Sequence, residues 1–369
     1  MKWSWNLGRI FGIDLKIHST FVLLLIWIAI STLIAGGDFI AVGTEILLIL
    51  ALFMCVVFHE LGHALMARRF GIPTKDITLL PIGGVARLDK MPEKPKEELL
   101  VAIAGPAVNL FIGTLLFSGL LLTGAFSQGI DLTTVSNSFW LQLMVVNFTL
   151  VAFNLIPAFP MDGGRILKAL LALKMTSVKA TRLAANIGRG IAVLMGIAGF
   201  FFNPWLILTA IFVWYGAGAE ARSAEINQGL KGLVVRDALI SQFYQVEANQ
   251  PLSTVFQLSL QTGQHNLPVV SNGHFLGIIR RADLLNALDK MGERAPAYAA
   301  IGAEPEDVNL DMPLTEVLPL FSTNRVLPVI ENRQLMGLIT PESVQQRLWL
   351  NRHTQEADRQ PPKEKINPI

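Results

Sequence analysis

Residues 46–67 read ILLILALFMCVVFHELGHALMA, an apolar run that is long enough to cross a bilayer and that carries His59, Glu60 and His63 near its end. On a helix, residues four positions apart lie on one face, so the two histidines can direct ring nitrogens at a single metal ion. Glu60 follows the first histidine and can take a proton from a water molecule bound to that ion. Such patterns also occur by chance, but ionisable side chains are costly at membrane depth unless they are paired or coordinated. The run therefore predicts a metal site within a membrane helix.

The composition is that of a membrane protein. Of 369 residues, 52% are hydrophobic and only 16% are charged, and the mean hydropathy is +0.48. This is too apolar for an ordinary soluble protein and indicates several membrane spans. The formal net charge of +2 gives no case for a nucleic-acid partner. The first apolar stretch is longer than a typical signal-peptide core and begins well inside the chain, so no cleavable signal peptide is expected.

Six apolar runs are each near the roughly 20 residues that a helix needs to cross about 30 Å of hydrocarbon. The predicted fold is therefore mainly α: a polytopic membrane domain with six transmembrane helices at residues 1–222, followed by a soluble α/β domain. The predicted spans are 17–35, 45–67, 99–122, 139–157, 187–202 and 204–219.

The distribution of lysine and arginine predicts the orientation of these spans. Basic residues are numerous before the first span and after the second and fourth, whereas 36–44 and 123–138 contain none. The positive-inside rule places both termini and the C-terminal domain in the cytoplasm of a bacterial or archaeal type of cell. The segment before the first span, with Trp3 and Trp5, suits an interfacial strand or hairpin, or simply an aromatic anchor.

A turn or hairpin is expected between the second and third spans. Residues 81–88 read PIGGVARL, and Gly83 and Gly84 allow a close approach of backbones. An exposed strand edge at this point could pair with an extended substrate, which makes the two glycines candidate substrate-binding residues.

A tetrahedral catalytic zinc ion needs three protein ligands and one open position, so the two histidines require a partner. The best candidate is Asp162, in the stretch NLIPAFPMDGG at 154–164. The predicted orientation brings this stretch and the histidines to the same, cytoplasmic, depth of the membrane. Its prolines break helical hydrogen bonding and its glycines permit an unusual turn, so the chain can direct the carboxylate inward. The alternative for Asp162 is a helix cap or a surface carboxylate. The single cysteine, Cys55, lies four residues before His59 and is either a third ligand or, as we favour, a small apolar filler.

Three asparagines lie within the apolar spans. Asn154 could bind a substrate carbonyl or steady an oxyanion, and a plain interhelical hydrogen bond is the open alternative. Asn109 and Asn147 carry the same ambiguity, with the interhelical hydrogen bond favoured. The remaining histidines lack a partner at ligand spacing and are interpreted as ordinary residues: His18, His265, His274 and His353.

An internal repeat begins at about residue 230. Leu267-Pro268-Val269-Val270 is matched sixty positions later by Leu327-Pro328-Val329-Ile330, and Gly277-Ile278-Ile279 by Gly337-Leu338-Ile339. Each copy is expected to contain a helix, a strand, a polar turn, a second strand and another helix. The copies, at about 230–290 and 300–349, should pack as a pair, and 351–369 is expected to be a disordered tail.

The motifs of residues 10–220 together resemble the site-2 protease family of intramembrane metalloproteases. They are the HExxH sequence, the Gly83-Gly84 element, the Gly105-Pro106 to Asn109 run and the Asn154 to Gly164 stretch, in that order. The resemblance implies one zinc ion held by His59, His63 and Asp162, Glu60 as the general base, and Asn154 as a residue that positions the substrate or transition state. It also implies cleavage of transmembrane segments of single-span regulatory proteins, such as anti-sigma factors or membrane-tethered transcription factors.

Residues 230–349 resemble a tandem pair of cystathionine-β-synthase (CBS) domains, which often bind adenine nucleotides. The first copy has Arg280 where the nucleotide pattern has a hydroxyl residue, and Asp283 where it has an acid for the ribose. The second copy has Thr340 but no acid. These three residues are candidate nucleotide ligands, and Arg280 could meet a phosphate. A structural role, or homodimerisation through the CBS domains, remains the alternative.

The sequence therefore predicts a zinc-dependent intramembrane endopeptidase whose activity is modulated by CBS domains. The alternative is a metal or solute transporter regulated by such domains, with His59, His63 and Asp162 as a transit site. Transport does not require a glutamate beside the first histidine, whereas peptide hydrolysis does. A catalytically silent binding protein is disfavoured by the complete set of ligands and base.

Overall fold

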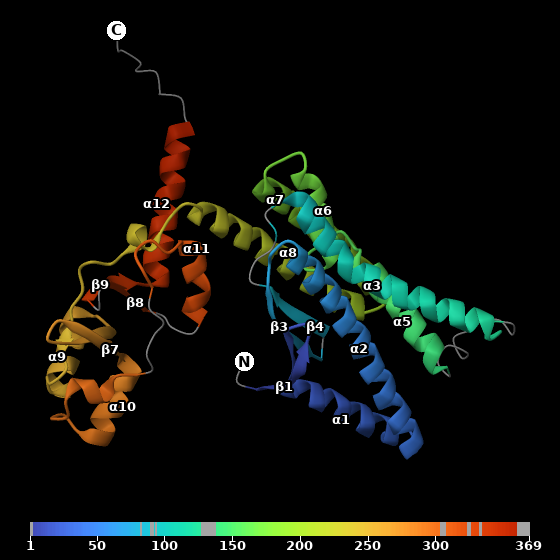
Figure 1. The fold of residues 1–369 in the computed structure, drawn as a ribbon, viewed down its shortest axis with the longest axis horizontal. Helices are drawn as coiled ribbons and strands as arrows, with labels where there is room; N and C mark the ends of the chain where they lie inside the picture. Colours follow the sequence, from blue (N-terminus) through green and yellow to red (C-terminus); the bar gives the residue numbers. More distant parts are fainter. Residues whose placement is uncertain are drawn as a thin grey trace, which may run out of the picture. The chain divides into compact units, whose positions relative to one another are not determined.

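The computed structural model describes residues 3–81, 83–88, 92, 94–126, 138–302, 308–322, 326–331 and 334–359. Within them the chain is mainly helical, and it divides into two compact units, Met1–Ala224 and Glu225–Ile369. Figure 1 shows mostly long helices in the first unit; the second unit has small sheets and short helices, apart from the longer helix Pro341–Arg359.

Apolar helices build most of the first unit, and each predicted span coincides with one of them. The span predicted at 187–202 corresponds to a helix that begins ten residues earlier, at Ser177, and ends at Phe201. In the added part, Ala184 and Ala185 pack with Phe159. The helices are α1 (Ser19–Ile34), α2 (Phe39–Arg69), α3 (Pro95–Leu122), α5 (Phe139–Asn154), the short α6 (Asp162–Ala172), α7 (Ser177–Phe201) and α8 (Trp205–Leu230).

Three helices among the described residues are long and apolar enough to cross a membrane: α2, α3 and α7. Helices α1 and α5 are apolar but have 16 residues each. At about 1.5 Å per residue they span about 24 Å, against about 30 Å of hydrocarbon. The predicted spans are longer because apolar residues also occur in the strand before α1, Ile13–His18, and in the irregular segment after Asn154. Most of the predicted outer loop 123–138 lies outside the described residues.

A four-stranded sheet belongs to the first unit, with the strands in the order β1 (Ser4–Ile10), β2 (Ile13–His18), β3 (Thr74–Leu80) and β4 (Gly83–Leu88). The sheet consists of two antiparallel hairpins joined by the parallel pairing of β2 with β3. The expected N-terminal hairpin is present. Within the second expected segment, Gly83–Leu88 forms one strand only, and it makes a hairpin with Thr74–Leu80. Strand β4 is at the edge of the sheet and contacts α2.

Helix α3 contacts α2, α5 and α6. Its approach to α2 is close, because a Cβ atom at Gly62 would lie only 2.8 Å from the carbonyl oxygen of Ala104. A glycine at this position therefore lets the histidine-bearing face of α2 pack directly on α3.

The second unit contains the repeated hairpin that the sequence predicts: β6 (Asn266–Ser271) with β7 (His274–Arg280), and β8 (Leu327–Glu331) with β9 (Gln334–Ile339). The register repeats at the same offset, since Leu267 pairs with Ile279 and Leu327 pairs with Ile339. Each half has its own apolar core. The other elements include β5 (Val246–Glu247), α9 (Leu252–Thr262), α10 (Arg281–Met291), α11 (Leu314–Val317) and α12 (Pro341–Arg359).

The predicted disordered tail, 351–369, is helical in its first part. Helix α12 continues to Arg359, and residues 360–369 lie outside the described residues. The helix extends past residue 350 because Leu348 packs on the core of the second half-repeat and the Asn351 amide donates a hydrogen bond to the Gly229 carbonyl at 2.9 Å. Polar composition alone did not reveal these contacts.

Candidate metal centre

The two histidines of the HExxH sequence lie one turn apart on the buried face of α2. His59 is 6% exposed and His63 is 4% exposed. Between them, Leu61 belongs to an apolar cluster that joins the helix to strand β3. The sheet therefore covers one side of α2 and α3 covers another, which removes both imidazoles from solvent.

Asp162 is the first residue of α6, and the backbone packs very closely around the two glycines that follow it. A Cβ atom at Gly163 would lie 2.2 Å from the Ile156 carbonyl oxygen, and one at Gly164 would lie 2.5 Å from the Phe159 nitrogen. The two glycines thus let α6 begin tightly against the irregular segment that follows α5. Asp162 is consequently only 7% exposed, and its side chain faces the histidines rather than solvent.

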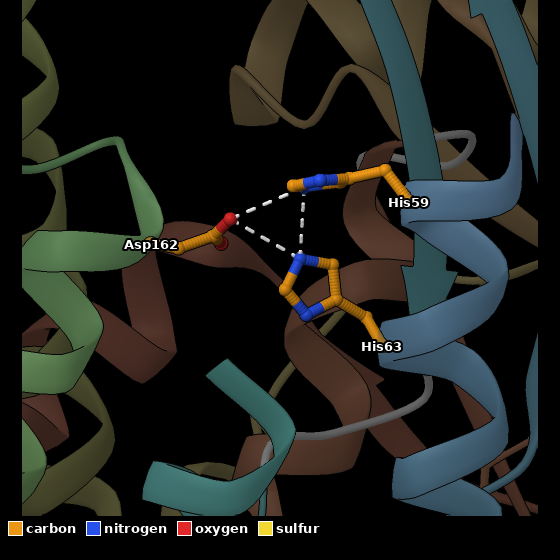
Figure 2. A group of neighbouring side chains, drawn as sticks. All are labelled: His59, His63 and Asp162. Carbon is orange, nitrogen blue, oxygen red and sulfur yellow. Dashed lines mark hydrogen bonds and ion pairs between the residues drawn. The ribbon is translucent and has the colours of Figure 1, made fainter. Parts of the chain in front are cut away.

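The three side chains converge from two helices (Figure 2). Asp162 Oδ2 lies 3.2 Å from the Nε2 atom of His59 and 3.2 Å from that of His63. The two Nε2 atoms lie 3.1 Å from each other. Among the described residues, these three form a group that could hold a metal ion. Each offers one ligand atom, and the three atoms lie within 4.8 Å of one another.

The chemistry of these atoms fits a zinc ion. The Val101 carbonyl accepts a hydrogen bond from Nδ1 of His63 at 2.7 Å, which leaves the Nε2 lone pair directed at Asp162. Asn109 Oδ1, 3.2 Å from Nδ1 of His59, fixes the same tautomer there. Three buried acceptor atoms then face one another, an arrangement that requires a cation. Ligands at about 2.0–2.1 Å from a tetrahedral zinc lie about 3.3 Å apart, close to the separations observed.

Helix α3 contributes these outer contacts. The sequence favoured an ordinary interhelical hydrogen bond for Asn109, and the structure directs that bond to an imidazole of the metal group. Val101 was missed, because a backbone carbonyl has no signature in the sequence. Gly105 also belongs to this surface, since a Cβ atom there would lie 2.2 Å from Nε2 of His63.

Glu60 lies beside the metal group and against the edge strand. It is half-buried on α2. A Cβ atom at Gly84 of β4 would lie 2.8 Å from Cγ of Glu60 and 3.0 Å from a methyl carbon of Val56. The edge strand that the sequence proposed for substrate pairing therefore runs directly beside the proposed general base, while Gly83, with φ +136°, begins that strand.

The other candidates from the spans do not all join this group. Cys55 is buried and accepts a hydrogen bond from the Asn147 amide at 3.4 Å, and that amide also bonds the Leu143 carbonyl at 2.8 Å. Both residues thus have a structural environment, in keeping with the favoured interpretation. Asn154 is the half-buried last residue of α5, and its role in substrate positioning stays a prediction.

The candidate nucleotide ligands lie in the second unit. Arg280 precedes α10, and Asp283, in its first turn, lines a cavity of about 170 Å³ with Asn286 and Gly302. This volume is below the roughly 300–1,000 Å³ of ordinary ligand pockets. Thr340 caps α12 through reciprocal hydrogen bonds with Ser343, each 3.2 Å long. The nucleotide role of these residues stays a prediction.

Comparison with known proteins identifies the first unit. The model of peptidase family M50 matches residues 47–135 and 126–196. A zinc metalloprotease of Methanocaldococcus jannaschii is 34% identical over 346 residues, which cover 93% of this chain and 96% of that protein. The chain belongs to the M50 family, the site-2 proteases. This M50 peptidase is therefore a membrane metalloprotease.

Other similarities cover parts of this M50 peptidase. Stage IV sporulation protein FB of Bacillus subtilis is 29% identical over 157 residues, or 42% of this chain and 51% of that protein. The solved site-2 protease of Methanocaldococcus jannaschii is 40% identical and covers 60% of this chain and 96% of its own, with a TM-score of 0.43. The CBS domain model matches residues 235–290, so the second unit contains a CBS domain.

Proposed function

We propose that this M50 peptidase is a zinc-dependent intramembrane endopeptidase that cleaves transmembrane segments of single-span regulatory proteins, of the anti-sigma factor or tethered transcription factor type. The observation that supports this most directly is the buried group of His59, His63 and Asp162, with Glu60, the residue after His59, packed against Gly84 of the edge strand β4. Membership of a metalloprotease family favours hydrolysis over the transporter alternative.

The two imidazoles and the Asp162 carboxylate would hold the zinc ion. When bound, zinc supplies polarisation of the scissile carbonyl and makes water acidic enough to deprotonate near neutral pH. The protein keeps the ligand atoms directed inward through Asn109 and the Val101 carbonyl, and it excludes bulk water by burying all three side chains.

Glu60 is the proposed general base. Its carboxylate accepts a proton from the attacking water and returns it to the leaving amine nitrogen of the substrate. Because it adjoins both the metal group and Gly84 of β4, it lies on the side from which an extended substrate would approach. Asn154, at the end of α5, is the proposed hydrogen-bond donor to the substrate carbonyl or to the oxyanion.

A substrate helix has to unwind before its peptide bonds can be cut, because its carbonyl and amide groups are hydrogen-bonded to each other. Strand β4 offers an alternative set of hydrogen bonds along its outer edge. We place the unwound segment there, with Gly83 and Gly84 permitting a close approach of the two backbones.

The proposed topology has six crossings with both termini in the cytoplasm. The basic segments after the second and fourth helices support this orientation. The proposed domains are residues 1–222 for proteolysis and 230–349 for a pair of CBS domains at about 230–290 and 300–349. The pair would adjust proteolysis, through an adenine nucleotide at Arg280, Asp283 and Thr340 or through association of two chains.

The test uses the full-length protein in liposomes with a single-span reporter. Cleavage products are identified by mass spectrometry, and zinc removal by a chelator followed by zinc addition serves as the control. We expect a cut inside the transmembrane segment that depends on zinc. Cleavage only in the extramembrane part of the reporter, or at a rate unchanged by chelation, would contradict the proposal.

A further inference from the structure

Helix α3 supplies none of the three proposed zinc ligands, yet it contacts each segment that carries one. Its Asn109 bonds His59, its Val101 carbonyl bonds His63, and its Glu98 bonds Lys168 of α6, the helix that begins with Asp162. We propose that the buried ion pair Glu98–Lys168 is a positioning pair that holds Asp162 at the metal site. This inference rests on the proposed metal site.

The ion pair is short and largely removed from solvent. Lys168 Nζ lies 2.7 Å from Oε1 of Glu98, and the exposed fractions of the two side chains are 14% and 4%. Glu98 lies in the first turn of α3 and Lys168 in the second half of α6. The pair therefore joins α3 and α6 through two residues that are seventy positions apart in the sequence.

Its place on α6 connects it mechanically with Asp162. Lys168 lies six residues after Asp162 on the same eleven-residue helix, a distance of about 9 Å along the axis at about 1.5 Å per residue. A helix this short moves as a rigid body. The start of α6 is already confined by the tight packing of Gly163 and Gly164, so a second attachment point in the second half of the helix fixes the direction in which Asp162 points.

Its place on α3 connects it with the other ligands. Glu98 precedes Val101 by three residues, which puts both on one face of α3. The Val101 carbonyl orients His63, so one turn of α3 sets the position of a histidine on α2 and of the aspartate on α6. A change in that turn alters the distance between two zinc ligands.

Stability alone does not account for a buried ion pair well. Desolvation of two charges offsets most of their attraction, and apolar side chains of similar volume often stabilise a structure equally. What an ion pair adds is a defined geometry between the two groups. Residues that orient metal ligands from outside the ligand set typically change metal affinity by about 10–100-fold when they are replaced.

The test measures zinc affinity of the full-length protein in detergent by competition with a chromogenic chelator. Glu98→Gln is compared with Glu97→Gln, its neighbour, which forms an exposed pair with Lys94 at 2.8 Å. The charge reversal, which combines Glu98→Lys with Lys168→Glu, restores an ion pair in which the two charges have exchanged places. The visible spectrum of the cobalt(II) protein reports the ligand geometry, and thermal unfolding of the zinc-free protein reports the fold.

We expect Glu98→Gln to weaken zinc binding by about tenfold or more and to change the cobalt spectrum. Glu97→Gln should bind zinc as the wild type does, and the charge reversal should recover most of the affinity. Wild-type zinc affinity in Glu98→Gln, or a folded charge reversal without recovery, would overturn the proposal. If Glu98→Gln does not fold, zinc affinity and the cobalt spectrum are measured on the double variant Glu98→Gln with Lys168→Gln. The same outcomes then support or overturn the proposal. Because no substrate is involved, a negative result is distinct from failure of the proposed proteolysis.

Discussion

Gly84 lies directly against Glu60, so closely that a Cβ atom at Gly84 would be 2.8 Å from Cγ of the glutamate. One residue belongs to the edge strand β4 and the other to the HExxH turn of α2. The proposed substrate-binding edge and the proposed general base therefore share one contact. Substitutions on either side of this contact should affect catalysis before they affect folding.

Gly84→Ala should lower the rate of reporter cleavage while leaving the zinc content unchanged. The added methyl group displaces the Glu60 side chain, and displacement of a catalytic group by about 1 Å can cost about 100-fold in rate. Cleavage kinetics and metal analysis measure the two effects. Gly43→Ala, on the same helix as Glu60 and with no atom within 4 Å of the added methyl group, is the control and should cleave normally. Equal activity of the two variants would remove β4 from the catalytic centre.

Gly105→Ala should act on the metal instead. A Cβ atom at this position would lie 2.2 Å from Nε2 of His63, a ring that has little freedom to move because Val101 holds its other nitrogen. We expect zinc to be lost on purification, as measured by elemental analysis. Gly119→Ala lies on the same helix in open space and should retain one zinc ion per chain. Full zinc occupancy in Gly105→Ala would show that the proposed site is misplaced.

Asn109→Ala should weaken zinc binding by about 10–100-fold, because His59 loses the acceptor that fixes its tautomer. Asn109→Asp retains an acceptor at the same position and should retain more of the affinity. Asn147→Ala is a suitable comparison, since this buried amide bonds Cys55 and Leu143 rather than a histidine. It should reduce the free energy of unfolding by about 1–3 kcal/mol without changing zinc affinity. A similar loss of affinity in the two alanine variants would contradict an orienting role for Asn109.

The stability of the sheet should depend on pH in the acid range because of the ion pairs of Asp76 in β3. Lys16 lies 2.8 Å from its carboxylate, and Arg87 of β4 pairs with both of its oxygens. Burial opposes ionisation, but these two cations hold the pKa of Asp76 below its usual 3.8. A carboxyl group whose pKa is lower in the folded state than in the unfolded state contributes its full stabilisation at pH values above the unfolded-state pKa. This stabilisation is lost as the pH falls through the folded-state pKa.

Asp76→Asn should therefore lower the free energy of unfolding by about 1–2 kcal/mol at neutral pH. It should also flatten the decrease of thermal stability below about pH 4. Thermal unfolding in detergent as a function of pH measures both effects. Asp38→Asn is the control, because Asp38 caps α2 at an exposed site and lies outside the sheet. Parallel pH profiles for wild type and Asp76→Asn would show that this carboxylate is not held by its two partners.

Much of the site could be predicted from the sequence because its ligands are marked by their setting. His59, His63 and Asp162 are ionisable residues in apolar surroundings, and orientation from the basic loops brought the two segments to the same depth. The repeat of sixty residues likewise predicted two hairpins whose register the structure reproduces. In each case the prediction rested on a local pattern in the sequence.

What the sequence did not reveal depends on contacts between distant segments. The Val101 carbonyl has no residue-specific signal, and the Glu98–Lys168 pair looks like two ordinary charges at the ends of apolar runs. The lengths of α1 and α5 were overestimated because apolar residues also occur in the neighbouring strand and turn. Helix α12 extends beyond residue 350 because Asn351 bonds Gly229, a contact over more than a hundred residues.

The most direct test of the account combines zinc analysis with cleavage of a single-span reporter by Glu60→Gln. We expect one zinc ion per chain, because the amide replaces a residue outside the ligand set, together with a loss of cleavage of at least about 100-fold. Cleavage near the wild-type rate by the zinc-loaded variant would contradict the role of Glu60 and, with it, the proposed mechanism.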